Sequence, residues 1–191
     1  MTQQDRAVRT HQELIRSAAE AFDRYGFASA SLTGISTGAG VSSGALHFHF
    51  SSKRALGEAV ESAAAQALMA ILTVRPPGNP TPLQLLVHVS QLLGTRLTED
   101  AVLRAGFALA ADATWQGTGA LWPQWCTWVR SVLELAGSEG DLAADVVLDD
   151  AVAAVTTVVV GSQVLGRADS AWCPRLAVTR FWNLLLPRIS A

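Results

Sequence analysis

Apolar positions recur with the helical period along almost the whole chain. Gly26 closes the first such segment, residues 10–26, because glycine reaches the left-handed backbone region without a steric penalty. The segment predicts an amphipathic helix that packs against the residues after it, with Phe27 and Leu32 closing a small core. The apolar stripe of this helix consists of Leu14, Ile15, Ala18, Ala19 and Phe22.

Residues 33–54 predict two short helices joined by a tight turn. Ile35 and Ala39 lie four apart, so they share one face of the first helix, and Thr33 is its predicted N-cap. Gly40 supplies the turn, since glycine adopts a positive φ without a Cβ clash. The two helices should therefore meet at a sharp corner.

The second short helix, residues 43–48, begins with a serine pair. The hydroxyls of Ser42 and Ser43 are suited to cap it, and its free backbone N–H groups are suited to a phosphate. Two helices joined by so tight a turn can place the second helix in a DNA major groove while the first crosses the backbone. The same corner also occurs in purely structural helical proteins, so the geometry alone leaves both interpretations open.

A longer helical pattern runs from Lys53 to Leu72 and ends before residues 75–82, where four prolines exclude a helix. The predicted fold class is all-α. We expect a helix-turn-helix head of three helices, residues 1–56, joined by the long helix to a helical domain for ligand binding and dimerisation, residues 57–191. The further predicted helices span residues 83–97, 100–112, 121–137, 145–168 and 174–189.

The predicted helix 145–168 is apolar nearly all round. Such a helix is buried on more than one side, which favours packing against the domain on one face and against a second copy of the chain on another. The last helix is expected to supply the second element of this homodimer interface. The alternative is that both helices are simply core. The predicted dimer contacts are Val155, Val158, Val159, Phe181, Trp182 and Leu185.

Six tryptophans all lie after the linker. An indole N–H needs a hydrogen-bond partner when it is buried, so a helical domain rich in Trp suggests a cavity that holds a ligand. Ordinary packing is the alternative for at least three of them. The tryptophans predicted to line the cavity are Trp122, Trp125 and Trp128, together with Phe107.

The net charge of −2 is unevenly distributed. Residues 1–56 hold six basic and four acidic side chains, which leaves −4 for residues 57–191. A nucleic-acid partner is consistent with a net positive N-terminal part on a net negative remainder. Strong binding should nevertheless need the N-terminal parts of two chains together.

Cys126 and Cys173 have no CxxC spacing, which argues against a zinc site or a disulfide framework and suits a reducing cytoplasm. The polar start of the chain has no secretory signal. The longest apolar stretch, residues 151–160, is far shorter than the ~20 residues of a membrane span. We therefore expect a cytoplasmic protein without a membrane partner.

The segment AGVSSGALHFHFSSKRAL, residues 39–56, resembles the N-terminal signature of the TetR family of transcriptional repressors, and the likeness extends over residues 9–56. The resemblance implies a double-stranded DNA operator as partner. One departure is His47, where the family usually has tyrosine. The residues predicted to form the DNA face are Thr33, Ser42, Ser43, Gly44, His47, His49 and Lys53.

The segments LWPQWCTWVRSVLELAGSEGDL and VVGSQVLGRADS are similar to the ligand domain of the γ-butyrolactone autoregulator receptors, a TetR subgroup that controls secondary metabolism. This resemblance implies that Trp125 lines the pocket for a small hydrophobic signal. The match of residues 161–163 to the same subgroup adds Gln163 to the predicted ligand residues. Relatives in the subgroup respond to other lactones, furans or antibiotics, so the ligand's identity stays open.

Catalytic and metal-binding interpretations are less favoured. His47 and His49 point in different directions on a helix, and no GxSxG, P-loop or GxGxxG motif is present. We expect no catalytic residue, metal or cofactor. Two alternatives remain, which are an enzyme acting on a small hydrophobic molecule and a DNA-binding protein without a ligand.

Overall fold

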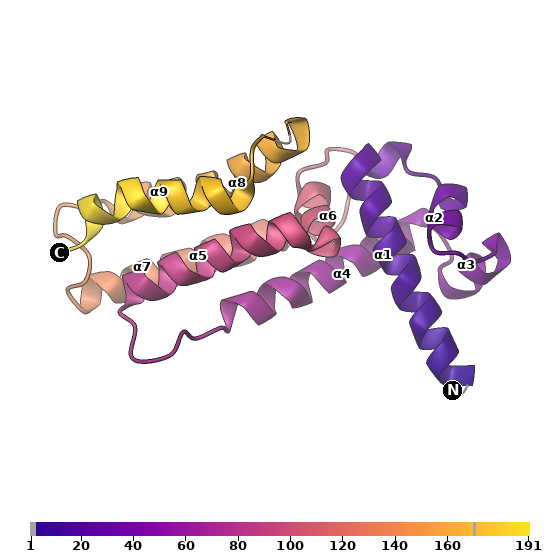
Figure 1. The fold of residues 1–191 in the computed structure, drawn as a ribbon, viewed down its shortest axis with the longest axis horizontal. Helices are drawn as coiled ribbons and strands as arrows, with labels where there is room; N and C mark the ends of the chain where they lie inside the picture. Colours follow the sequence, from indigo (N-terminus) through magenta and orange to yellow (C-terminus); the bar gives the residue numbers. More distant parts are fainter. Residues whose placement is uncertain (1–2, 170) are drawn as a thin grey trace. The chain divides into compact units, whose positions relative to one another are not determined.

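The computed structural model describes residues 3–169 and 171–191, and in these ranges the chain forms nine α-helices and no β-strand (Figure 1). The predicted all-α class is confirmed. The five helices predicted after the linker are present, each within three residues of its predicted ends. The helices are α1 (Gln3–Ser29), α2 (Leu32–Gly38), α3 (Ser43–His49), α4 (Lys53–Leu72), α5 (Pro82–Glu99), α6 (Ala101–Ala110), α7 (Leu121–Ser138), α8 (Leu148–Ala168) and α9 (Pro174–Ile189).

The chain forms two compact units. The first contains the residues up to Ala67 together with Asp100–Leu121, and the second contains Leu68–Glu99 and Trp122–Ala191. The first unit thus extends past residue 56, where we expect the DNA-binding module to end, and includes α6. A functional boundary at residue 56 stays a prediction, because compactness does not measure which residues bind DNA.

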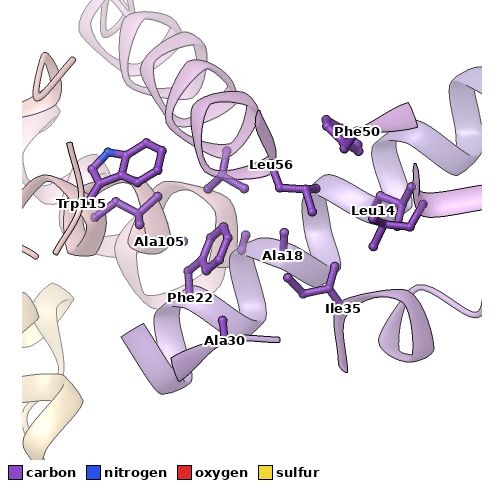
Figure 2. Close-up of a cluster of buried hydrophobic side chains, with 13 residues drawn as sticks. Leu14, Ala18, Phe22, Ala30, Ile35, Phe50, Leu56, Ala105 and Trp115 are labelled. Carbon is purple, nitrogen blue, oxygen red and sulfur yellow. The ribbon is translucent and has the colours of Figure 1, made fainter. Parts of the chain in front are cut away.

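The core of the first unit is built on the apolar stripe predicted for α1. Figure 2 shows Leu14 and Phe22 of α1 with Ile35 of α2 and Leu56 of α4, all of which are buried. Phe27 and other half-buried side chains close the edge of this core, as predicted. Gly26 has a φ of 75°, which kinks α1 before its last three residues.

The turn between α2 and α3 has the expected glycine. Gly40 has a φ of 67°, and the N–H of Val41 reaches back to the carbonyl of Ser36 at 3.0 Å. The predicted cap of α2 was wrong. Ser31 is the N-cap, because its Oγ accepts the N–H of Gly34 at 3.1 Å, while Thr33 lies within the first turn.

In the second unit, α9 packs against both α5 and α8. The α8 helix begins at Leu148 rather than at residue 145. Val155 and Val159 of α8 and Trp182 of α9 are buried in this unit. One face of α8 and one face of α9 therefore pack into the core of a single chain.

By length and composition, α4 and α8 could each cross a membrane, with hydropathies of 1.3 and 1.4 over their most apolar windows. This differs from the expectation of no such segment, because a window average tolerates the polar residues that interrupt a continuous apolar run. About 44% and 33% of these windows are buried inside the structure. Core helices pass the same test, so two such helices are weak evidence for a membrane.

Candidate DNA interface and ligand domain

The outer face of α3 carries the exposed residues Ser43, Gly44, His47 and Phe48. Gly44 and Phe48 are four apart, so they lie one above the other on the helix. The Phe48 side chain is 83% exposed, more than any other large apolar side chain that the structure describes. The sequence pattern did not assign Phe48 to this face, although its spacing from Gly44 is a signal that indicates it.

Ser42 is the N-cap of α3, as predicted, and its Oγ accepts the N–H of Ala45 at 3.1 Å. This bond satisfies one of the free N–H groups at the helix start. A Cβ built at Gly44 would meet only the Ser42 Oγ, at 3.8 Å. Gly44 therefore leaves open space in front of the helix backbone.

His49 is half-buried, and its ring is turned toward α1. It lies 5.8 Å from the ring of His11 and meets the ring of Phe48 edge to face at 5.3 Å. His11 also stacks on Phe50 at 4.6 Å. This chain of rings supports Phe48 from within the first unit.

Lys53 has partners that the sequence did not predict. Its Nζ donates hydrogen bonds to the carbonyls of Ala28 at 2.9 Å and Ala30 at 3.0 Å, and it lies 4.9 Å from the ring centre of Phe27. A cation at this position offsets the negative end of the helix dipole of α1. The structure therefore gives this ammonium a structural role at the end of α1. Thr33 is exposed, and its carbonyl accepts the hydroxyl of Ser36 at 3.0 Å.

The α6–α7 loop, residues 111–120, is bonded to α4. The N–H groups of Thr118 and Gly119 donate to the two carboxylate oxygens of Glu61 at 3.0 and 2.8 Å. Arg54 donates to the carbonyl of Gln116 at 2.9 Å. Glu61 is only 3% exposed, so its hydrogen bonds are shielded from water.

The same part of the chain is also bonded to α1. The guanidinium of Arg104 donates to Asp23 at 2.9 Å, and the N–H of Phe27 donates to the Asp112 carboxylate at 3.0 Å. Sequence reasoning missed these contacts because the partners are 81 and 85 residues apart and form no motif. In the first unit, α6 and the loop are therefore bonded to the two helices that frame the predicted DNA-binding elements.

The predicted ligand residues are partly brought together. Trp125 is fully buried on α7, and its ring stacks on that of Trp128 with centres 5.5 Å apart. The indole N–H of Trp125 has no hydrogen-bond partner among the described residues. Trp122 is half-buried on the same helix, and Gln163 is buried on α8. Phe107 is fully buried on α6 of the first unit.

The predicted dimer contacts fall into two groups. Val155, Val159 and Trp182 are buried inside the second unit, whereas Val158, Phe181 and Leu185 are half-buried. The prediction missed the apolar side chains of the same helices that are exposed. A helix that is apolar all round does not indicate which of its faces is free. The exposed side chains are Val164, Leu165, Leu176 and Leu184.

The chain matches known proteins over its whole length. Residues 14–60 match the model of the bacterial regulatory proteins of the TetR family. The A-factor receptor protein of Streptomyces griseus is 32% identical over 193 aligned residues, which cover 100% of this chain and 67% of that protein. The chain belongs to the TetR family. The predicted family resemblance is thus confirmed.

Two solved structures are similar to this TetR-family chain. One is a γ-butyrolactone receptor, an ArpA-like protein, with a TM-score of 0.84 and 26% identity over 97% of this chain and 90% of that chain. The other is CprB from Streptomyces coelicolor in complex with its operator sequence, with a TM-score of 0.83 and 27% identity over the same shares of the two chains. The similarity to both structures covers nearly the whole chain, whereas the family model covers only residues 14–60.

Proposed function

We propose that this TetR-family protein is a cytoplasmic transcriptional repressor that binds a pseudopalindromic operator as a homodimer and is released by a small hydrophobic signal of the γ-butyrolactone class. The observation that carries the proposal is the 32% identity to the A-factor receptor protein over the whole chain. The proposed role is the control of secondary metabolism. It is a regulatory role and not a catalytic one.

The DNA face that we propose is the exposed side of α3 together with the first turn of α2. Its residues are Thr33, Ser42, Ser43, Gly44 and His47, with His49 as the support behind them. A helix of this kind enters the major groove, and a dimer presents two of them one helical turn of DNA apart, about 34–36 Å. Lys53 is left out because its ammonium is engaged by the carbonyls at the end of α1.

The ligand site that we propose surrounds the stacked pair of Trp125 and Trp128. A fully buried indole whose N–H has no partner among the described residues offers one unused hydrogen-bond donor next to the apolar ring of Trp128. A lactone presents the complementary combination, a carbonyl acceptor on an apolar body. Ligand binding releases DNA only if the ligand has different affinities for the two forms of the dimer.

The test is a titration of a labelled operator, selected from random duplexes by the full-length protein, with and without a γ-butyrolactone. Saturable binding that the lactone reverses is the expected result. Failure to select any sequence would contradict the repressor role. Operator binding that the lactone leaves unchanged would contradict the proposed ligand class and not the DNA-binding role.

A further inference from the structure

Phe48 is placed where most of its apolar side chain is uncovered by the protein. Its ring is 83% exposed on the face of α3 that also carries Gly44 and His47. Exposed large apolar groups are informative when they lie on an interaction surface. On the proposed DNA face, the ring is therefore available to a partner outside the chain.

The ring of Phe48 has an aromatic neighbour on its own helix. His49 meets it edge to face at 5.3 Å, and His49 in turn lies 5.8 Å from His11 of α1. Gly44, one turn earlier, adds no side chain beside the ring. The ring of Phe48 therefore projects from α3 with free space on the side of Gly44.

The chemistry of the major groove limits what such a ring contacts favourably. The base edges there present hydrogen-bond donors and acceptors, and the methyl group of thymine is the one apolar group among them. A phenyl ring neither donates nor accepts a conventional hydrogen bond, and it gains nothing from a charged phosphate. Thymine is therefore the base that this side chain discriminates best.

We propose that Phe48 reads the methyl group of one thymine in each operator half-site and so sets the base preference at that position. This proposal rests on the proposed function, since it requires α3 to enter the major groove. It adds a specificity-determining residue that the pattern of polar side chains did not reveal.

The experiment replaces each thymine of the selected operator in turn by deoxyuridine, in both half-sites together, and measures the affinity of the full-length protein. Deoxyuridine removes only the methyl group. At one position the wild-type protein should lose affinity by about four-fold for each methyl group removed. Phe48→Ala should bind the thymine and deoxyuridine duplexes equally at that position. Low salt keeps the variant on DNA through its phosphate contacts, so that both affinities are measurable.

Two further variants serve as controls. Phe48→Leu keeps an apolar contact and should retain most of the methyl preference at the same position. Leu135→Ala removes an exposed apolar side chain on α7 and should behave as the wild type. The melting temperature of Phe48→Ala should equal that of the wild type, since the ring is mostly in solvent.

Two outcomes would overturn the proposal. One is a wild-type protein that is insensitive to every deoxyuridine substitution. The other is a Phe48→Ala protein that keeps the full methyl preference, which would assign that preference to another residue or to DNA shape. A wild-type protein that selects no operator would instead overturn the proposed function.

Discussion

The N–H of Gly119 donates a 2.8 Å hydrogen bond to the carboxylate of Glu61. Glu61 lies on α4, the helix that follows the proposed recognition helix α3, and the α6–α7 loop continues directly into α7, which carries Trp125. The bond therefore ties the helix after the recognition helix to the segment that leads to the proposed ligand residues. We predict that this bond contributes to the coupling between ligand binding and the release of DNA.

We predict that Glu61→Ala lowers the free energy of unfolding by about 2–4 kcal/mol, because the N–H groups of Thr118 and Gly119 lose a charged acceptor in a buried site. Glu61→Gln keeps one acceptor oxygen and should lose less. Denaturant titrations measure both effects, and hydrogen exchange should show faster exchange at the two amides. Unchanged exchange in Glu61→Ala would show that other bonds hold the loop.

Glu61→Gln also tests the coupling between ligand binding and DNA release. Glu61→Gln should bind the operator with near-normal affinity and need a higher concentration of γ-butyrolactone for release, because the loop then transmits movement less tightly. Fluorescence anisotropy of a labelled operator gives both values. An unaltered release curve would exclude this bond from the coupling between ligand and DNA.

Lys53→Met keeps the apolar stem over Phe27 and removes both hydrogen bonds to the end of α1. The expected result is a loss of about 1–3 kcal/mol of stability with an unchanged salt dependence of operator binding. Thermal melts and titrations at several salt concentrations measure the two quantities. A salt slope that falls by about one unit would instead place this ammonium on a DNA phosphate.

Gly44→Ala separates the effect of this position on the stability of α3 from its effect on DNA affinity. Alanine favours a helix over glycine by up to about 1 kcal/mol, and the new methyl group meets only the Ser42 Oγ at 3.8 Å, so stability should rise or stay constant. Operator affinity should fall, because the methyl group occupies the space where α3 approaches the bases. A stable variant with normal affinity would show that DNA does not approach this part of α3.

Trp125→Ala removes a fully buried ring and should lower stability by about 3–5 kcal/mol. Trp125→Phe fills most of the volume and lacks the indole N–H, so it isolates the proposed hydrogen bond to the ligand. We expect Trp125→Phe to bind the operator normally and to release it only at a higher lactone concentration. Release at the wild-type concentration would remove the indole N–H from the ligand site.

Leu184 tests the dimer interface, since its side chain on α9 is 78% exposed in the single chain. Leu184→Glu should yield folded monomers that bind the operator weakly, because a charge is costly in an apolar interface. Sedimentation measures the state of association, and circular dichroism verifies the fold. Leu135→Glu on α7 is the matched control and should remain dimeric. A dimeric Leu184→Glu protein would place the interface elsewhere.

Local features of the sequence determined the helices and the turn of the helix-turn-helix. The period of apolar residues predicted α4 as Lys53–Leu72 and α9 as Pro174–Ile189, with the bounds that the structure has. Gly40 adopts the positive φ that its position predicted. These features depend on residues within a few positions of one another, which a sequence displays directly.

Only the tertiary structure decided which side chain meets which partner. Lys53 donates hydrogen bonds to carbonyls that are 23 and 25 residues away in sequence. Glu61 accepts hydrogen bonds from N–H groups that are 57 and 58 residues away. Likewise, Val155 and Leu184 are both aliphatic, and only the packing of the chain buries the first and exposes the second. The physical reason is that the hydrophobic effect has no direction, so a pattern states which residues avoid water but not which neighbours cover them.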